Sequence, residues 1–170
     1  MDWEFDESYG PAYEVAQICL NGHVINDCAR TESVRNQEHC QQCGESTTTK
    51  CNSCASEIRG RLMGPGIVHI QYFLPSYCWK CGRRYPWTER RLQAAKDFAD
   101  ELDELNESER ETLKQSIDVL AKDSPASEVG LARVKKIFQK LGQKSKEKMY
   151  GLLVDVGSEV IKKKLDDYIP

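Results

Sequence analysis

The chain has 170 residues, a formal net charge of -3, and 39% hydrophobic and 30% charged residues. This length suits one medium domain or two small ones, and the composition is that of a globular protein. The negative charge argues against nucleic-acid binding through the overall electrostatic field. Any such binding would need a local basic patch.

The sequence predicts a cytoplasmic protein without a membrane span. Residues 1–7 are acidic and have neither the basic start nor the apolar core of a signal peptide. No apolar run approaches the roughly eighteen residues that a membrane helix needs. In a reducing compartment, closely spaced cysteines are more often metal ligands than disulfides, and a secreted disulfide framework is the alternative interpretation.

The first half of the chain is predicted to form a small β-rich module over residues 13–87, after a loose leader over residues 1–12. Within it, the alternating pattern of residues 13–19 favours a short strand, and Asn21-Gly22 favours a tight turn. Residues 67–74 also have the apolar face of a strand.

Residues 88–170 are predicted to form a separate bundle of about four helices, so the expected fold class is α+β. Apolar residues recur at steps of three and four, as in helices that bury one face against each other. The third helix is expected to reach Gly142, and the fourth to cover residues 145–165. The first three helices have capping signals at Thr88, Ser108 and Ser124.

The surface of this bundle offers two hypotheses about partners. In the last helix, apolar residues cover more of the circumference than in the others, and Gly151 and Gly157 accompany them. This pattern could indicate self-association or docking on a partner. Acidic residues gather over residues 97–111 and basic residues over residues 133–148, and we expect the two sets to complement each other. The alternative is that the basic set and Lys162-Lys163-Lys164 hold an anionic partner.

Seven of the eight cysteines lie in short pairs that are typical of zinc ligands. Two thiolates separated by two residues can face one ion, and a glycine after the second cysteine permits a sharp turn. In the first pair a histidine replaces the second cysteine, and its longer side chain suits three intervening residues. The expected ligands of two structural Zn2+ ions are Cys19, His23, Cys40, Cys43, Cys51, Cys54, Cys78 and Cys81.

The pairing of these ligands is open at this point. The short link over residues 44–50 favours sequential pairing, with the first four ligands on one ion and the last four on the other. A cross-braced arrangement is the alternative. Cys28 could replace His23, but it lacks the turn residues of the other pairs, so we expect it to be a bystander. His39 and His69 are expected to be surface residues.

The sequence offers no catalytic constellation. We therefore expect that the protein is not an enzyme and has no small-molecule substrate. A zinc site with four protein ligands has no open position at which to activate water. The motifs of zinc deaminases and His-Glu-x-x-His enzymes do not occur, and Gly64-Pro-Gly66 lacks the residues that complete a phosphate loop. Cys78-Trp-Lys-Cys81 could form a redox pair, but three companion pairs favour zinc.

Several linked motifs together identify a family. They are Ile18-Cys-Leu-Asn-Gly-His-Val-Ile25, Cys40-x-x-Cys-Gly44, Cys51-x-x-Cys54 with Ile58-Arg-Gly60, and Tyr77-Cys-x-x-Cys-Gly82 with Tyr85-Pro-Trp-Thr88. This set resembles an uncharacterised bacterial family, domain of unknown function 2321, over nearly the whole chain. The resemblance implies a double zinc-ribbon-like module followed by helices. It implies no mechanism, because the activity of the family is unknown. Cys28 lies outside these motifs.

Two functions compete on this sequence. In the first, the protein is a protein–protein interaction or adaptor module in which zinc holds a rigid surface and the helices dock a partner or self-associate. In the second, it is a nucleic-acid-binding zinc-ribbon regulator whose arginines contact phosphates and whose aromatic residues stack. The acidic charge favours the adaptor. Candidate partner-binding residues are Arg59, Arg61, Trp79, Arg83 and Arg84, and the nucleic-acid hypothesis adds Arg90, Arg91, Tyr72, Tyr77, Tyr85 and Trp87.

Overall fold

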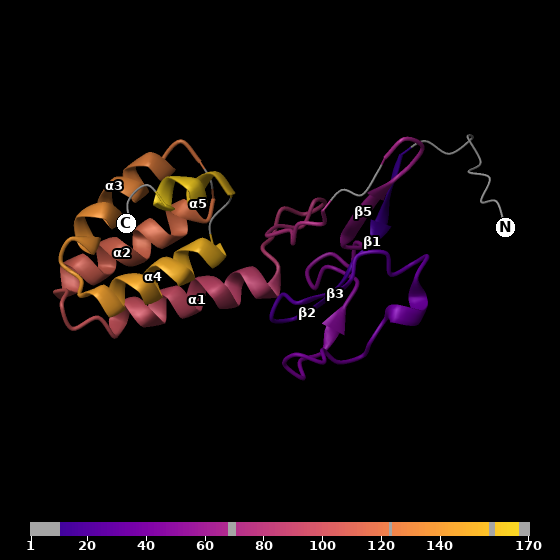
Figure 1. Ribbon diagram of the computed structural model, residues 1–170, viewed down its shortest axis with the longest axis horizontal. Helices are drawn as coiled ribbons and strands as arrows, with labels where there is room; N and C mark the ends of the chain where they lie inside the picture. The colour runs from indigo at the N-terminus through magenta and orange to yellow at the C-terminus, as the bar shows by residue number, and fades with distance from the viewer. Residues whose placement is uncertain (1–10, 68–70, 123, 157–158, 167–170) are drawn as a thin grey trace. The chain divides into compact units, whose positions relative to one another are not determined.

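The computed structural model describes residues 11–67, 71–122, 124–156 and 159–166. The chain divides into two compact units, residues 1–88 and residues 89–170. Short strands occupy the first unit and helices the second (Figure 1). This arrangement confirms the predicted α+β class. None of the helices in the described ranges is long and apolar enough to cross a membrane.

The described residues of the first unit form two small antiparallel sheets. Strand β1 (Ala12–Val15) pairs with β5 (Arg59–Met63), and β2 (Gln17–Cys19) lies between β3 (Val24–Asn26) and β4 (Thr47–Thr48). A short 3-10 helix, Ser33–Arg35, lies between β3 and β4 in the chain. The strand expected over residues 13–19 is therefore two strands, which belong to different sheets and are separated by the fully buried Ala16.

The strand expected over residues 67–74 is not present in the described part of that range. Residue 67 and residues 71–74 adopt no strand, and residues 68–70, which include His69, lie outside the described residues. Tyr72 and Leu74 instead pack at the edge of the core, and the Tyr72 hydroxyl donates a hydrogen bond to the Arg59 carbonyl at 2.9 Å. In the described residues 71–74, the alternation thus reflects partial burial of Tyr72 and Leu74 rather than strand pairing.

The core of the first unit is small and includes two of the predicted metal ligands. Tyr85 and Trp87 stack with their ring centroids 4.5 Å apart, and the Trp87 indole N–H donates to the Pro75 carbonyl at 2.8 Å. So few apolar side chains give a unit of this size limited stability from burial alone. The buried core residues are Ala16, Ile18, Cys51, Ile58, Cys78, Tyr85 and Trp87.

Close backbone packing explains the glycine in the Ile58-Arg-Gly60 motif. The Ala16 N–H donates to the Ile58 carbonyl and the Arg61 N–H donates to the Asp27 carbonyl, each at 2.9 Å. A Cβ atom on Gly60 would lie 2.2 Å from the Asp27 carbonyl oxygen. Only glycine fits where these backbone segments meet.

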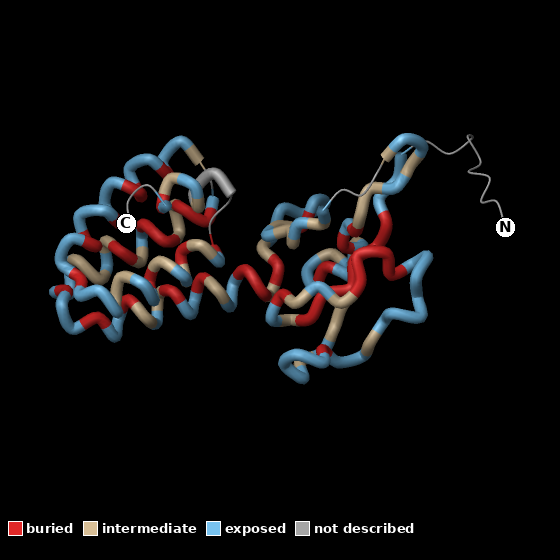
Figure 2. Tube along the Cα trace, viewed as in Figure 1, coloured by how far each residue is buried: buried red, intermediate tan, exposed pale blue. Residues whose placement is uncertain are grey.

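The second unit is built from helices that share one apolar core. Buried positions recur along the helices at the steps that the sequence predicts (Figure 2). Apolar residues from every helix, among them Leu92, Leu113, Leu131, Met149 and Leu165, belong to this core. The helices are α1 (Pro86–Asp100), α2 (Glu107–Leu120), α3 (Ser127–Phe138), α4 (Gln143–Val156) and α5 (Glu159–Asp166).

The predicted starts of α1 and α2 are late by three and two residues. Helix α1 begins at Pro86, and the Thr88 hydroxyl donates to the Ser76 carbonyl at 2.9 Å rather than capping the helix. Helix α2 is capped by Asn106, whose side chain accepts from the Glu109 N–H at 3.0 Å while the Glu109 carboxylate accepts from the Asn106 N–H. Both Asn106 and Ser108 precede a glutamate by three residues, and the earlier cap gives the longer helix.

The later helix boundaries also differ from the prediction. Helix α3 begins at Ser127, whose hydroxyl accepts from the Ser124 N–H, and it ends at Phe138 rather than near Gly142. The single helix expected over residues 145–165 is two helices, α4 and α5. Helix α5 returns to α3 through an ion pair between Lys164 and Glu128. Gly157 lies outside the described residues.

Opposite charges meet within the helical unit. Lys140 of the basic stretch pairs with Glu109 of the acidic stretch. Lys114 pairs with Asp100 of the acidic stretch at 2.5 Å. The Lys114–Asp100 pair joins α2 to α1, and the Lys140–Glu109 pair joins the segment after α3 to α2.

Candidate metal centres

The structure brings the eight predicted ligands together in two groups of four. In each group, one ligand atom from every residue lies within 4.8 Å of the others. The groups follow the sequential pairing: Cys19, His23, Cys40 and Cys43 in cluster 1, and Cys51, Cys54, Cys78 and Cys81 in cluster 2. Each cluster could hold a metal ion.

The thiols within each cluster are separated by similar distances. In cluster 1, Cys19 Sγ lies 3.9 Å from Cys43 Sγ and 3.4 Å from His23 Nδ1. Cys40 Sγ lies 3.5 Å from the same imidazole nitrogen. In cluster 2, the Sγ atoms of Cys51 and Cys81 are 3.8 Å apart and those of Cys54 and Cys78 are 3.7 Å apart. All these cysteines are free, since a disulfide would bring two sulfurs to about 2.05 Å.

The three Cys-x-x-Cys pairs have the same backbone structure. At the first of them, the Cys40 N–H donates to the Glu45 carbonyl and the Gly44 N–H donates to the Cys40 carbonyl, both at 2.8 Å. The same two hydrogen bonds recur after Cys51 and after Cys78, at 2.8 to 2.9 Å. The turn is therefore set by local sequence, and each turn delivers its two thiols to one side.

The residue after the second cysteine has a left-handed backbone in all three turns. Gly44 and Gly82 have φ angles of 71° and 69°, which glycine adopts without strain. Ala55 occupies the same position in the remaining turn with a φ of 56°. It is the only non-glycine residue with positive φ in the described ranges, and its backbone is strained.

The Cys19–His23 turn differs because it has one more residue between its ligands. Cys19 ends β2 and His23 precedes β3, and the Cys19 N–H donates to the His23 carbonyl at 3.0 Å. Gly22, with a φ of 91°, closes the turn through its N–H and the Cys19 carbonyl. The predicted Asn21-Gly22 turn thus brings the imidazole back to the thiol.

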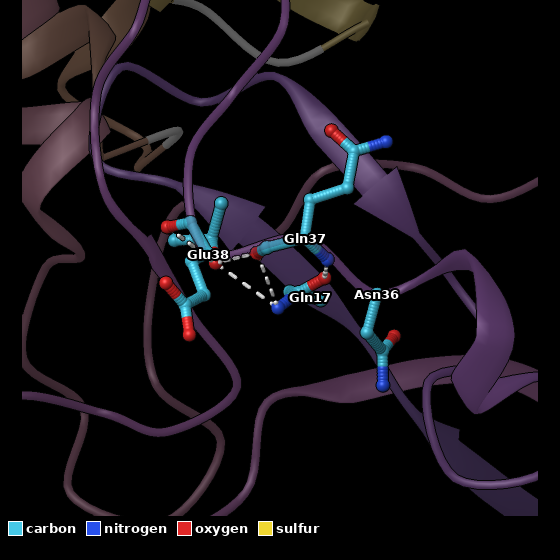
Figure 3. A pocket seen from close by; sticks show the side chains of 5 residues that line it. Gln17, Asn36, Gln37 and Glu38 are labelled. Carbon is cyan, nitrogen blue, oxygen red and sulfur yellow. Dashed lines mark hydrogen bonds between the residues drawn. The ribbon is translucent and has the colours of Figure 1, made fainter.

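A glutamine that the sequence analysis did not single out connects the segments that carry cluster 1. The Gln17 side chain pairs with the backbone of Gln37: its Oε1 accepts from the Gln37 N–H and its Nε2 donates to the Gln37 carbonyl, both at 2.9 Å (Figure 3). The same Nε2 donates to the Thr47 hydroxyl at 3.0 Å. Because Gln17 is two residues before Cys19 and Gln37 three before Cys40, this network holds the two ligand pairs in register.

A serine plays the corresponding part in cluster 2. Ser56 Oγ lies 3.1 Å from Cys54 Sγ and 3.2 Å from Cys78 Sγ. The Ser56 hydroxyl lowers the pKa of Cys54. Burial alone would raise the pKa of Cys78, but hydrogen bonds from Ser56 and from the backbone of Cys81 and Lys80 lower it to about 5. Ser56 has one hydrogen to donate, so it favours the thiolate of Cys54 or of Cys78, and the thiolate is the form that binds metal.

Each cluster combines buried and exposed ligands. Cys43 and Cys81 are exposed, whereas the first cysteine of every pair is buried. The backbone N–H of Glu45 is the main cause that lowers the pKa of Cys43, to about 6. Both clusters thus lie at the surface of the first unit with one thiol open to solvent.

Cys28 and His39 belong to neither cluster. Cys28 is buried, its N–H donates to the Asn26 side chain at 3.0 Å, and burial raises the pKa of its thiol. His39 is exposed and forms an isolated bridge with Ser46. His23, rather than Cys28, therefore completes cluster 1.

The candidate partner-binding residues have different environments. The Arg59 guanidinium lies over the rings of Trp79 and Tyr13, while Arg61 donates two hydrogen bonds to Asp27, at 2.7 and 2.9 Å. Arg83 is exposed and Arg84 is half-buried. Asp27 and Tyr13 were not predicted as functional residues, because nothing in the local sequence indicates which arginine each one meets.

Several residues of the nucleic-acid hypothesis are not available for stacking. Tyr85 and Trp87 are each 1% exposed and belong to the core. Tyr72 is half-buried, with its hydroxyl bonded to Arg59. Arg91 donates to the Asp155 carbonyl at 3.3 Å within the helical unit. Tyr77 is half-buried and Arg90 is exposed.

The fold and the clusters define an α+β protein with two cysteine-rich sites, each suited to a metal ion. Residues 12–165 match the family described as "Uncharacterized protein conserved in bacteria (DUF2321)". The chain belongs to this family, which confirms the resemblance seen in its motifs. Comparison with curated proteins found no match, and comparison with solved structures found none either.

Proposed function

We propose that the protein is a non-catalytic adaptor whose first unit is held by two structural Zn2+ ions. The spacing of the donor atoms carries this proposal. A tetrahedral zinc ion with Zn–S bonds of about 2.3 Å and Zn–N bonds of about 2.0 to 2.1 Å separates two sulfurs by about 3.8 Å and a sulfur from a nitrogen by about 3.5 Å. The clusters have S–S distances of 3.7 to 3.9 Å and S–N distances of 3.4 and 3.5 Å.

The chemistry of the donors supports zinc over other common metals. Thiolate and imidazole ligands in tetrahedral groups suit Zn2+, whereas Mg2+ and Ca2+ prefer oxygen ligands. Four protein ligands saturate each ion and leave no position for water or substrate. This saturation supports a structural role and a protein without enzymatic activity.

Structural metal ions would also compensate for the limited stability that the small core of the first unit provides. Metal binding contributes to folding free energy when the unfolded chain has no preformed site. Cluster 2 contributes two of its cysteines directly to the core, so a bound ion would cross-link the segments around Tyr85 and Trp87. A unit stabilised in this way can present a rigid surface to a protein partner, and the helical unit supplies a second surface for docking or self-association.

Metal analysis of cysteine variants tests the structural-zinc part of the proposal. The full chain purified under reducing conditions is expected to contain about two zinc ions. Cys51→Ser should lose the ion of cluster 2 and retain the ion of cluster 1. The matched control Cys28→Ser, which removes a buried thiol outside both clusters, should retain both ions. An ion lost from Cys28→Ser would contradict the assignment of cluster 1.

Nucleic-acid binding is the second candidate, and the exposed Arg59, Trp79 and Arg83 favour it. Mobility-shift titrations with single-stranded and double-stranded DNA at two salt concentrations test this candidate. Phosphate contacts predict binding that weakens as salt increases. An absence of binding at low salt would eliminate it, and the adaptor function would stand.

A further inference from the structure

An arginine stacked on two exposed aromatic rings forms a surface feature of the first unit. The Arg59 Cζ lies 4.2 Å from the ring centroid of Trp79 and 4.7 Å from that of Tyr13. Trp79 is 52% exposed and Tyr13 is 48% exposed. We call these three residues the aromatic–arginine surface; they come from β5, from the Cys78–Cys81 turn and from β1.

This surface is ordered before any partner arrives. The Trp79 indole N–H donates to the Glu57 carbonyl at 3.0 Å, which fixes the ring, and the Tyr72 hydroxyl holds the Arg59 carbonyl. Fixed aromatic and arginine side chains lose little conformational entropy on binding. Tryptophan, tyrosine and arginine are also the residues that contribute most to protein interfaces.

The Arg59 guanidinium meets no carboxylate among the described residues. By contrast, Arg61 pairs with Asp27, Arg30 with Glu57, and Arg35 with Glu32. A guanidinium that stacks through its faces keeps its N–H edges for a planar anion such as a carboxylate.

The neighbouring turn adds further positive charge. Lys80 and Arg83 are exposed on the same turn as Trp79, and neither has an ion-pair partner in the described part of the chain. The local charge is therefore positive on a protein whose net charge is -3. Charge complementarity of this kind selects an acidic partner.

We propose that the aromatic–arginine surface docks an acidic segment of a partner protein, one that also carries apolar side chains. A carboxylate of the segment pairs with Arg59, and its apolar side chains cover the rings of Tyr13 and Trp79. Nucleic acid fits this surface less well, because the protein is acidic overall. The faces of Arg59, on which a base would stack, also already contact the rings of Tyr13 and Trp79. The inference rests on the proposed adaptor function, since a bound ion would hold the turn that carries Trp79.

Fluorescence anisotropy with defined peptides tests the inference on the full, zinc-loaded chain. The probe is a labelled peptide of four Glu-Phe repeats, compared with peptides of four Gln-Phe and four Lys-Phe repeats. The Glu-Phe peptide is expected to bind, and its binding should weaken as salt increases. Arg59→Gln should weaken it by about tenfold or more, and so should Trp79→Ala. Arg35→Gln, which removes an exposed arginine elsewhere in the same unit, should leave it unchanged.

Three results would overturn the inference. They are no binding of the Glu-Phe peptide, equal binding of the Gln-Phe peptide, and equal losses in Arg59→Gln and Arg35→Gln. Tighter binding of a thymidine oligonucleotide than of the Glu-Phe peptide would assign the surface to nucleic acid instead. Zinc content is measured on every sample, so a failure to bind with two ions retained counts against the docking site alone. A wild-type chain without zinc would contradict the proposed function.

Discussion

Ser56 Oγ lies 3.2 Å from Cys78 Sγ and 3.1 Å from Cys54 Sγ, so one hydroxyl reaches a thiol from each of the two pairs in cluster 2. Ser56 also accepts the Cys51 N–H at 2.8 Å through its carbonyl. A single residue outside the ligand set therefore contacts three of the four cysteines. Partners of this kind orient metal ligands and tune their charge.

Replacing Ser56 by alanine should weaken metal retention in cluster 2. The variant removes the hydroxyl, which can donate its one hydrogen to the thiolate of Cys54 or of Cys78, and the expected loss of zinc affinity is about tenfold. Competition with a chromophoric chelator measures it, and cluster 1 should retain its ion with unchanged affinity. Ser53→Ala is the matched control, because Ser53 is exposed and only its backbone N–H contacts a thiol. Equal affinities in the two variants would show that the hydroxyl has no part in the site.

Ala55→Gly should stabilise the first unit by about 1 kcal/mol, because it relieves a left-handed backbone that costs an L-residue about 1 to 2 kcal/mol. The reverse changes, Gly44→Ala and Gly82→Ala, should destabilise by a similar amount. An added Cβ meets nothing within 4 Å at either glycine, so these variants report backbone strain alone. Unfolding in guanidinium followed by tryptophan fluorescence gives the differences. Loss of stability in Ala55→Gly would contradict the prediction.

Gly60→Ala should disrupt the first unit. Its Cβ would lie 2.2 Å from the Asp27 carbonyl oxygen and 2.8 Å from the Val15 carbonyl carbon, so backbone must move. A loss of about 3 kcal/mol or more is expected from such overpacking. Guanidinium unfolding of the zinc-loaded protein measures this loss. If Gly60→Ala proved as stable as the wild-type chain, the close packing of Ile58-Arg-Gly60 against residues 15 and 27 would be wrong.

Gly151→Ala should have the opposite effect in the helical unit. Gly151 is exposed within α4, and its added Cβ would meet nothing within 4 Å. Alanine should therefore stabilise the helix by about 1 kcal/mol. Thermal unfolding by circular dichroism measures the gain, and light scattering measures the mass of the particle. A change of mass, or a loss of stability, would indicate that this position contacts another chain.

The metal clusters could be predicted from sequence because their geometry is local. Each pair of ligands is presented by a turn of a few residues, and the spacing and the glycines of that turn are visible in the chain. Ser56 and Gln17 could not be predicted in the same way. Their partners, Cys78 and Gln37, are 22 and 20 residues distant, and many serines and glutamines have similar local surroundings.

The errors in the predicted fold have similar physical origins. Asn106 and Ser108 both have capping-box spacing, and the choice between them depends on how many helical hydrogen bonds the longer helix gains. The apolar alternation of residues 67–74 reports burial of Tyr72 and Leu74, but not whether a neighbouring strand is available. The pattern of residues 145–165 also does not show that its last part, α5, contacts α3, as the Lys164–Glu128 pair does.

Zinc-edge X-ray absorption of the purified full chain shows whether both clusters are saturated zinc sites. Two saturated sites share seven sulfur ligands and one nitrogen ligand, an average of 3.5 sulfurs and 0.5 nitrogens per ion. We expect this shell with Zn–S distances of about 2.3 Å and no bound water. A shell with fewer than three sulfurs per ion, or one with an oxygen ligand from solvent, would contradict two saturated structural sites.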